Sequence, residues 1–465
     1  MRIRSRTAVH GATAAAALAG VLVIASLNSA DFTASVADTT TTTHLYELDV
    51  PARTSAAHDA ELLENQGFDV LHGGSTTSVK VLASDNERSR LTHLGFKPKV
   101  ARALPEVTWK TPTASGDTYY GGYPTISGQY THMRQVAHKN PRLAKVINYG
   151  RLWRKLNGVA NGYDLKAICI TAITSKKDCS LSPKAPKKRF LLMGQLHARE
   201  IATGDIAYRW IDELVDNYGS DKTVTKLMKN TEFWVIPVAN PDGVDIVQSG
   251  GDAPQLQRKN ADSSHEATAC PTPPTDEGQS GVDLNRNNGV AWNSGGSSSD
   301  PCSPAYMGPS ADSEPETVAI HNLLRKLYPD TRGPELTDVA SPDSRGMFIG
   351  LHSDVRTVLF PWAYTKDLAP NDAALRAVAK HLADDTGYRY GKVSELMYAA
   401  SGGLDDWSYG ELGIPSFTIE VGSMTNTTCN GFLPVHSCMD TDYWPNLRTA
   451  LLHAAELADA PYTVN

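Results

Sequence analysis

In the stretch RFLLMGQLHARE, from Arg189 to Glu200, an apolar run typical of a buried strand is followed by three side chains that are unfavourable to bury. The apolar run Phe190–Met193 predicts a strand inside a sheet, because it is hydrophobic on both faces. His197, Arg199 and Glu200 follow this run closely. Burial of such groups requires a compensating charge or ion, so the end of this strand is the first candidate functional site.

Strand-type and helix-type segments alternate through the rest of the chain. Four more apolar runs predict strands: YDLKAICITA, EFWVIPVAN, GMFIGLHS and PSFTIEVG. Four segments with helical periodicity predict helices: ATGDIAYRWIDELVDNYG, SEPETVAIHNLLRKLY, NDAALRAVAKHLADDTG and NLRTALLHAAELADA. The alternation predicts an α/β fold with a mixed, largely parallel sheet between helix layers. In such folds, functional side chains gather beyond the carboxyl ends of strands. His197, Asn240, His352 and Glu420 all lie at or near the end of a predicted strand.

The N-terminus has the build of a secretory signal. A basic start, MRIRSR, precedes an apolar run of 16 residues from Ala12 to Leu27, and SVA ending at Ala37 fits a cleavage site of small residues. The alternative is a membrane anchor, for which the run is short and rich in alanine. Residues 1–37 therefore predict a secreted, extracellular protein that has no membrane contact after removal of the signal.

Composition places mild limits on the partners of the chain. Its 465 residues carry a formal net charge of −7, with 41% hydrophobic and 20% charged residues. Nothing in this balance favours nucleic acid or an anionic membrane surface as a partner.

Four segments follow the predicted signal. Residues 38–44 are a threonine-rich spacer, 45–102 a small module, 103–118 a linker rich in Pro, Gly, Ser and Thr, and 119–465 the main domain. The small module has the predicted order strand, helix, two strands, helix and strand, which is that of a split ferredoxin-like unit. It contains no cluster of catalytic residue types.

Six cysteines remain after the predicted signal, an even number that indicates disulfides in an oxidising compartment. They fall into near-neighbour pairs along the sequence, and we expect these pairs to bond: Cys169 with Cys179, Cys270 with Cys302, and Cys429 with Cys438. A zinc cluster is the alternative, and the lack of any CxxC in the sequence argues against it.

The spacing of His197 and Glu200 can aim an imidazole and a carboxylate at one metal ion. Zinc takes such ligands, and a catalytic zinc site needs three of them and one open position. For HxxE alone, a capping glutamate beside an unrelated histidine is the commoner explanation. Two more strands end in His352 and Glu420. A lone histidine is more often a satisfied core residue, but three strands that each end in a possible metal ligand or base are harder to dismiss than any one of them.

Other hydrolase chemistries lack their motifs in this sequence. The nearest approach to HExxH is HEATA from His265, which has Ala269 in place of the second histidine and lies in a loop-like region. GxSxG is absent, and the cysteines are expected to be paired. A serine or cysteine nucleophile is therefore disfavoured.

Ten short motifs, in order along the chain, resemble those of zinc metallocarboxypeptidases of the pancreatic carboxypeptidase A/B type: HARE, NPDGVD, QRKN, GVDLNRN, YMG, SEPE, HSD, YAASGGLDDWSYG, SFTIEV and NGFLP. The resemblance extends from about Tyr119 to the end of the chain. It implies the fold of that family, one Zn²⁺ per chain and removal of C-terminal residues. The 45–102 module resembles the inhibitory pro-domain of such zymogens in predicted topology only.

The resemblance assigns a metal site and a base. It implies that His197, Glu200 and His352 bind zinc and that Glu420 is the general base. It also implies that Asp283 holds the free ring nitrogen of His197, as a partner behind a metal ligand does.

Substrate-binding residues follow from the same motifs. Asn285 and Arg286 match the pair that grips the terminal carboxylate, assisted by Tyr398. The planar guanidinium of Arg286 suits a carboxylate because it donates two parallel hydrogen bonds. Arg258 would polarise the scissile carbonyl, and Arg199 would line the approach to the site.

A second arginine segment competes with the one around Arg258. LWRK, which contains Arg154, resembles the corresponding segment of the family more closely than LQRK does, but it precedes the zinc motif. The order of motifs therefore favours Arg258, and we expect Arg154 at the surface.

Asp405 falls where the family places the floor of the pocket for the C-terminal side chain, which implies a preference for Lys or Arg ends. The alternative is a turn residue beside Asp406, and mixed specificity stays open. Two features depart from the family pattern. Asp354 stands where an aromatic residue is common, and the segment 331–345 is unusually long and has no predicted function.

We therefore expect a secreted zinc metallocarboxypeptidase, monomeric, that acts on peptide and protein C-termini. Glu420 would take a proton from water and deliver it to the leaving amine, while Arg258 meets the charge on the carbonyl oxygen. The alternatives are a zinc amidopeptidase that acts on cell-wall peptides and a non-catalytic peptide-binding module of the same fold.

Overall fold

The structure is a computed structural model that describes residues 43–49, 55–65, 68–71, 77–103, 116–159, 162–266, 268–275 and 278–464. The predicted signal, and most of the predicted spacer and linker, lie outside the described residues. Residues Thr41–Asn465 form one compact unit. None of the described helices has both the length and the hydropathy that a bilayer-spanning helix needs.

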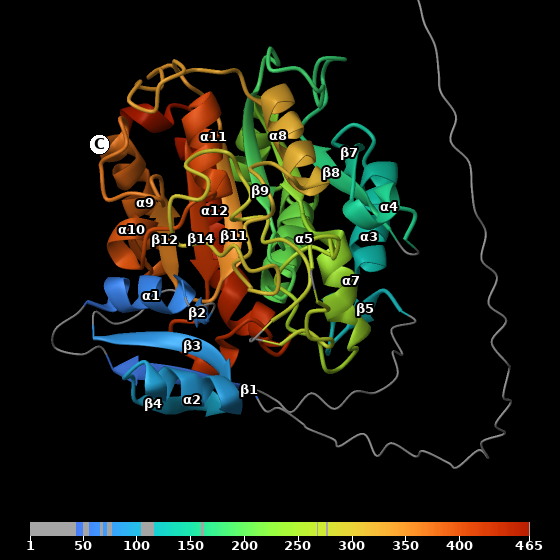
Figure 1. The fold of residues 1–465 in the computed structure, drawn as a ribbon. Helices are drawn as coiled ribbons and strands as arrows, with labels where there is room; N and C mark the ends of the chain where they lie inside the picture. The colour runs from blue at the N-terminus through green and yellow to red at the C-terminus, as the bar shows by residue number, and fades with distance from the viewer. Residues whose placement is uncertain are drawn as a thin grey trace, which may run out of the picture. The chain divides into compact units, whose positions relative to one another are not determined.

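The N-terminal module has the predicted order of elements: β1 (Thr43–Asp49), α1 (Ala56–Asn65), β2 (Asp69–Leu71), β3 (Ser78–Ser84), α2 (Asp85–His93) and β4 (Pro98–Ala103). Its strands form an antiparallel sheet in the order β2-β3-β1-β4 (Figure 1). Tyr46 and Leu48 of β1 are fully buried, as the two-residue period of a strand with one buried face predicts. β1 begins two residues before the predicted boundary of the module.

Eight strands form the main sheet in the order β13-β12-β14-β11-β9-β10-β8-β7. Their bounds are β7 Ala144–Arg151, β8 Asp164–Ile170, β9 Lys188–Met193, β10 Thr231–Ile236, β11 Met347–Ser353, β12 Thr357–Phe360, β13 Arg389–Lys392 and β14 Ser416–Val421. The central strands β10, β9, β11 and β14 are parallel, whereas β7, β8 and β12 introduce antiparallel pairs. The prediction of a mixed, largely parallel sheet is confirmed. A separate two-stranded ladder joins β5 (Thr118–Tyr119) and β6 (Tyr123–Pro124).

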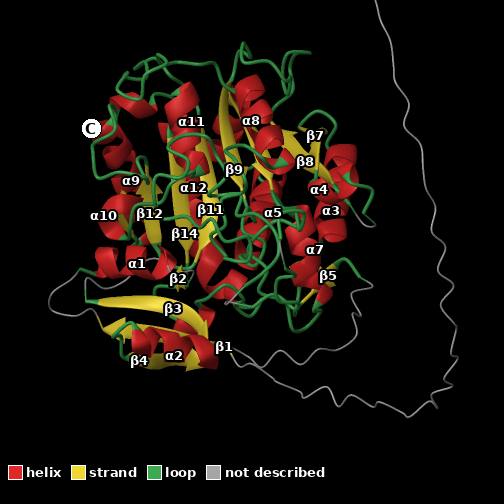
Figure 2. Ribbon diagram, in the orientation of Figure 1, coloured by secondary structure: helices red, strands yellow, loops and turns green. Residues whose placement is uncertain are grey.

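Helices cover the main sheet on both sides (Figure 2). The helices are α3 Ile126–Lys139, α4 Trp153–Leu156, α5 Ile201–Asp216, α6 Lys222–Asn230, α7 Pro241–Ser249, α8 Pro315–Leu327, α9 Asp372–Thr386, α10 Val393–Leu396, α11 Leu404–Leu412 and α12 Trp444–Leu457. α12 packs against α5, α6 and α9, while α8 packs against α11. Short helices of other types span Thr427–Cys429, Met439–Tyr443 and Pro461–Thr463. All four predicted helices are present, as α5, α8, α9 and α12.

The three predicted cysteine pairs are disulfides in the structure. Their Cα–Cα distances are 5.7, 5.3 and 5.6 Å, within the usual range for such a bond. The prediction from sequence spacing is confirmed.

The long segment 331–345 is a packed loop. The Arg332 guanidinium donates to the carbonyl oxygens of Tyr409 and Gly410, at 3.2 Å each, and lies over the ring of Tyr409. Ala340 N donates to Asn371 Oδ1 at 2.9 Å. These contacts attach the loop to α11 and to the start of α9, which gives the segment a structural role.

The parallel strands bring residues that are distant in the sequence together at their shared C-terminal ends. β11 pairs with β9 on one side and with β14 on the other, so that the three strands end at the same edge. His352 lies opposite Glu420 in the register of β11 and β14. This edge carries the candidate site.

Candidate active site

His197 and Glu200 lie in the turn between β9 and α5, with Glu200 at the N-cap of the helix. Gly194 lets this turn approach α5 closely, because a Cβ atom at Gly194 would lie 2.6 Å from Thr203 O. The Thr203 hydroxyl donates to Glu200 O at 2.7 Å and accepts from Gln195 N at 2.9 Å. These bonds fix the turn that carries the imidazole and the carboxylate.

Three metal-type donors meet at the edge of the sheet. His197 Nδ1 lies 2.8 Å from Glu200 Oε1, His352 Nδ1 lies 3.0 Å from Glu200 Oε2, and the two Nδ1 atoms are 3.1 Å apart. All three residues are buried. The residues predicted as zinc ligands are therefore brought together, with their candidate ligand atoms facing one another.

The donor chemistry of this group fits zinc. His197 Nε2 faces Asp283 Oδ1 at 3.2 Å, so the proton belongs on Nε2 and Nδ1 presents a lone pair. That lone pair faces a second imidazole nitrogen and a carboxylate, an arrangement that a cation would stabilise. Tetrahedral zinc with bonds of 2.0–2.1 Å needs its ligand atoms roughly 3.3 Å apart, close to the separations seen here.

Asp283 connects the histidine to Arg258. Its Oδ2 atom accepts from Arg258 Nε at 2.9 Å, and Arg258 Nη2 lies at the same distance. Burial opposes ionisation of Asp283, but Arg258 and His197 outweigh it and lower its pKa well below the usual value. Burial, followed by the charge of Arg258, lowers the pKa of His197 and keeps that imidazole neutral, the form that binds metals.

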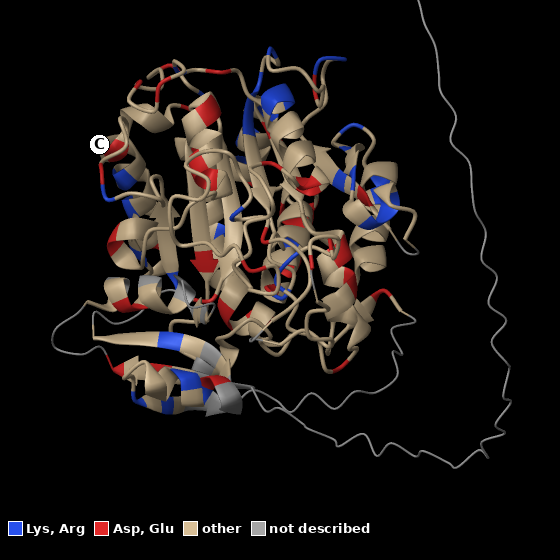
Figure 3. Cartoon of the chain, in the orientation of Figure 1, with Lys and Arg blue, Asp and Glu red and all other residues tan. Residues whose placement is uncertain are grey.

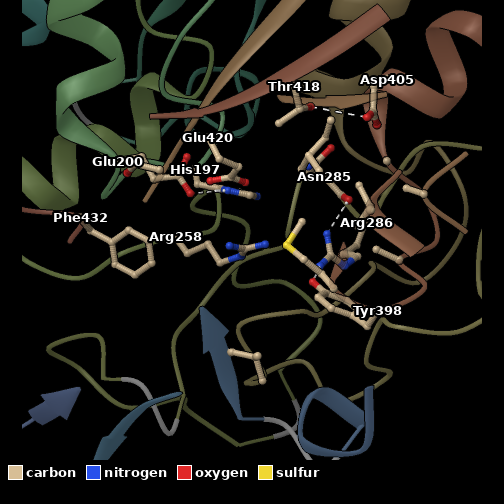
Figure 4. Close-up of a pocket in the computed structure, with 18 residues that line it drawn as sticks. His197, Glu200, Arg258, Asn285, Arg286, Tyr398, Asp405, Thr418, Glu420 and Phe432 are labelled. Carbon is tan, nitrogen blue, oxygen red and sulfur yellow. Dashed lines mark hydrogen bonds and ion pairs between the residues drawn. The ribbon is translucent and has the colours of Figure 1, made fainter. Parts of the chain in front are cut away.

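The predicted carboxylate clamp forms one wall of the same cavity (Figure 4). Arg286 Nη2 donates to the Tyr398 hydroxyl at 2.6 Å, and Arg286 Nε donates to Gly296 O at 2.8 Å. Asn285 Oδ1 accepts from Leu404 N at 3.0 Å, which fixes the orientation of the amide. The structure thus gathers the three predicted clamp residues.

Asp405 lies deeper in the cavity, beside Thr418 (Figure 4). Asp405 Oδ1 accepts from Asp406 N at 3.0 Å, and Oδ2 lies 3.5 Å from the Thr418 hydroxyl. Burial raises the pKa of Asp405. The neighbouring walls are apolar or small: Leu359, Ala363, Met397, Ala400 and Gly403.

Glu420 also faces the cavity and is 7% exposed. Burial raises its pKa to about 8. A carboxylate with raised pKa holds a proton more strongly than a solvated one does, which suits proton transfer near neutral pH.

Arg199 and Arg154 lie away from the lining of the cavity. Arg199 is fully buried and its guanidinium lies 4.0 Å from the ring centre of Phe432, which itself lines the cavity. Arg154 lies on α4, where its Nη1 atom pairs with Asp245 at 2.9 Å. Its side chain is 18% exposed, so Arg154 is a partly exposed, ion-paired residue that does not line the cavity.

A second metal-type group lies outside the cavity. Candidate ligand atoms of Asp262, His265 and Glu314 lie within 4.8 Å of one another. Ser264 donates two hydrogen bonds to Asp262 Oδ1, and Asn260 Nδ2 donates to Glu314 Oε2 at 2.7 Å. The carboxylates of this group therefore already accept hydrogen bonds, and the group offers one imidazole where the first offers two.

One residue of the cavity, Thr418, and one buried lysine next in sequence to Arg258 were missed in the sequence. Thr418 precedes Glu420 by two positions in β14, so the two-residue period of a strand places both on the cavity side. Lys259, next to Arg258, is fully buried, and its Nζ atom donates to Pro301 O at 2.7 Å. Burial lowers its pKa to about 7. The strand period could have revealed Thr418, whereas nothing in the local sequence marks Lys259 as buried.

Comparison with known proteins identifies similar chains. The profile of the family described as zinc carboxypeptidase matches residues 129–446. Carboxypeptidase A2 of Mus musculus is 28% identical over 354 residues, which are 74% of this chain and 72% of that protein. Carboxypeptidase B2 of Bos taurus is 29% identical over 320 residues, 67% of this chain and 65% of that protein.

A solved structure shares the fold. The crystal structure of carboxypeptidase A from Helicoverpa armigera superposes with a TM-score of 0.70 at 21% identity. The alignment covers 91% of this chain and 98% of that one. At this identity the likeness concerns the fold alone.

Proposed function

This chain belongs to the zinc carboxypeptidase family, and we propose that it is a secreted exopeptidase that removes C-terminal residues, with a preference for Lys and Arg ends. The observation that carries the proposal is the composition of one cavity. It is lined by the metal-type donors His197 and Glu200, by the cations Arg258 and Arg286, and by Asp405. Such a cavity suits a peptide end that carries a carboxylate and a basic side chain.

We propose one zinc ion per chain, held by His197, Glu200 and His352. Zinc bound there would supply Lewis-acid polarisation of the scissile carbonyl and acidification of a water molecule. Asp283 would orient His197 through its Nε2 atom, which keeps Nδ1 available as a ligand.

Glu420 is the proposed general base. Its carboxylate would take a proton from the attacking water and pass it to the leaving amine. Arg258 would donate to the carbonyl oxygen as negative charge develops there, and its contact with Asp283 holds the guanidinium in place before the substrate arrives.

The clamp would select a free C-terminus. Arg286 is fixed by Tyr398 and Gly296 O, so that little side-chain freedom is left to lose when a carboxylate binds. Asn285 has its oxygen turned to Leu404 N, which makes its amide nitrogen the group that can donate to the substrate. An amidated peptide end lacks the charge that this clamp recognises.

Asp405 would read the C-terminal side chain. Its raised pKa reflects burial, and a bound ammonium or guanidinium would stabilise the ionised carboxylate. The apolar walls suit the methylene stem of Lys or Arg. The same walls would accept aliphatic or aromatic ends at lower efficiency, so we propose a preference for basic ends and not an absolute requirement.

We further propose that the 45–102 module is an inhibitory pro-domain joined by the 103–118 linker to the 119–465 catalytic domain. Val70 of β2 lines the cavity, which has a volume of about 50 Å³. That space holds a few water molecules, far less than a substrate side chain needs. Tyr46 and Leu48 share a hydrophobic cluster with Leu359 and Tyr398 of the main domain.

Secretion is proposed from the 1–37 signal and the spacer 38–44, and it agrees with the three disulfides. The proposed partners are peptide and protein C-termini, bound by a monomer.

A panel of peptides that differ only at the C-terminal residue tests the proposal, with each peptide also supplied with an amidated end. We expect cleavage of free Lys and Arg ends first, slower cleavage of Phe and Leu ends, and none of amidated ends. Asp405→Asn, which removes the charge at almost constant shape, should abolish the basic preference and keep Phe and Leu cleavage. A basic preference that survives this substitution contradicts the pocket assignment, and cleavage of amidated ends favours the amidopeptidase alternative.

The pro-domain proposal needs a separate experiment. The full chain should be nearly inactive on the Lys-ended peptide, and limited proteolysis within 103–118 should activate it. Full activity of the uncut chain would contradict this proposal while leaving the exopeptidase proposal intact.

A further inference from the structure

A second cavity, which is basic, lies at the N-terminal ends of the central strands, opposite the ends that carry the candidate active site. It lies beside the first residues of β9 and β10, whereas His197 follows the other end of β9. The cavity has a volume of about 560 Å³, and its charged lining residues are Lys187, Lys188, Lys226, Lys229, Arg345, Glu456 and Asp459. Five cationic side chains thus face two carboxylates, in a chain with a net charge of −7.

A row of lysines on α6 extends this basic face. Lys222, Lys226 and Lys229 lie at positions i, i+4 and i+7, which share one side of a helix, and all three are exposed. Val224, Leu227 and Met228 form the buried side of the same helix. The helix therefore presents its charges outward. Figure 3 shows basic residues on the first part of β9, the strand that begins with Lys188 of the cavity lining.

The charges of this face are only partly neutralised. Asp459 lies 3.6 Å from Lys188 Nζ and 3.0 Å from Arg345 Nη2, so one carboxylate serves two cations. Lys187 lies 3.4 Å from Asp178. Within the described part of the chain, no ion pair of Lys226 or Lys229 is found, which leaves both ammonium groups for an external partner.

We propose that this basic face binds a flexible anionic polymer that carries phosphate or sulfate groups. Lysine side chains are mobile point charges, which suit a chain of dispersed anions better than a planar group of fixed geometry. Single-stranded nucleic acid sites add aromatic side chains on which bases stack. Among the described residues that line this cavity none is aromatic, so the polymer is one without bases.

The position of the face separates binding from catalysis. A polymer bound at the N-terminal ends of β9 and β10 lies at the other end of these strands from the cavity that contains His197. Bound polymer would hold the enzyme at a polyanionic surface and leave its cleft open to peptides. This inference concerns the full chain and does not depend on the proposed specificity.

Binding of the full chain to polyphosphate and to heparin, measured at about 0.1 M salt, tests the proposal. The double substitution Lys226→Glu and Lys229→Glu should weaken binding to both polymers by roughly tenfold or more and make it less dependent on salt. The matched control is Lys97→Glu with Lys366→Glu, which changes the net charge equally at two exposed lysines of other surfaces. Lys366 lies beside β13, because its carbonyl oxygen accepts from Lys392 Nζ at 2.6 Å.

Each outcome decides the proposal. Selective weakening by the α6 substitutions supports it, and binding of only one polymer identifies phosphate or sulfate as the recognised group. Failure of both polymers to bind the wild-type chain overturns it, as does equal weakening by the control substitutions. Single-stranded DNA that binds as tightly as polyphosphate would overturn the restriction to polymers without bases.

Discussion

Two regions of this molecule bury carboxylates completely, and their environments differ. Around His197 of the candidate active site, Glu200 and Asp283 face imidazole or guanidinium groups, which outweigh the effect of burial and lower the pKa of both acids. At the start of α8, the hydrogen-bond donors of Glu316 are neutral: Trp153 N at 2.9 Å and Asn260 Nδ2 at 3.3 Å. These donors do not offset the effect of burial, and burial raises the pKa of Glu316 to about 8.

The difference shows what burial alone does and what a cation adds. A buried carboxyl group without a cation keeps its proton and acts as a neutral hydrogen-bonding group. A buried carboxyl group beside a fixed guanidinium, as Asp283 is beside Arg258, loses its proton more readily and can orient a metal ligand or a guanidinium. Substitutions in the first region should therefore affect catalysis, and those in the second only stability.

The largest expected effect belongs to Glu420→Gln. The substitution keeps the size of the side chain and removes its ability to take a proton, so kcat should fall by roughly 10³-fold or more. Zinc content, measured on the same sample, should stay unchanged because Glu420 is not a proposed ligand. Retention of most of the activity would remove Glu420 from the mechanism.

Asp283→Asn should have an intermediate effect. The amide keeps a hydrogen bond to His197 but loses the charge that pairs with Arg258, and zinc affinity or activity should fall by roughly 10–100-fold. A competition titration with a chelator measures the affinity. Asp242→Asn is the matched control, since Asp242 is also buried but lies outside the cavity and outside both groups of possible metal ligands, and it should leave zinc affinity unaltered. Equal losses in both variants would mean that general destabilisation is the cause.

The smallest expected effect on catalysis belongs to Glu316→Gln, which should leave kcat/KM unchanged. In the wild type the folded chain keeps a proton on Glu316 up to about pH 8, whereas the unfolded chain releases it near the usual value of 4.5. The free energy of unfolding should therefore fall as pH rises through this window, by about 3 kcal/mol between about pH 5 and about pH 7.5.

Glutamine does not titrate, so the variant should lose this part of the pH dependence and become more stable than the wild type at neutral pH. Denaturant unfolding at the two pH values provides the measurement. An identical pH dependence in both proteins would show that Glu316 is not the group responsible.

Much of the fold could be predicted from local sequence. The runs that became β9, β10, β11 and β14 are apolar on both faces because they lie inside a parallel sheet. The strands β12 and β13 were not predicted, since each has four residues and is identified only by its pairing. The disulfides were predictable because their partners are close along the chain.

The site was less accessible to local reasoning. His197 and His352 are 155 positions apart, and each alone resembles an ordinary core histidine. The pattern of strand ends suggested that His197, His352 and Glu420 belong together, but only the ordered motifs of a known family assigned their roles and added Arg258, Asn285 and Arg286. The basic face could not be predicted for another reason. The net charge of −7 describes the whole chain and gives no sign of a local cluster, and the lysines of α6 and those at the start of β9 come together only in the folded structure.

Elemental analysis of the purified chain, combined with removal and return of metal, tests the central claim most directly. We expect about one zinc per processed chain, loss of activity when a chelator removes it and recovery when zinc is added back. A variant with His197→Ala and His352→Ala should hold no stoichiometric zinc. Active wild-type protein that contains no zinc, or a double variant that still binds one zinc tightly, would contradict it.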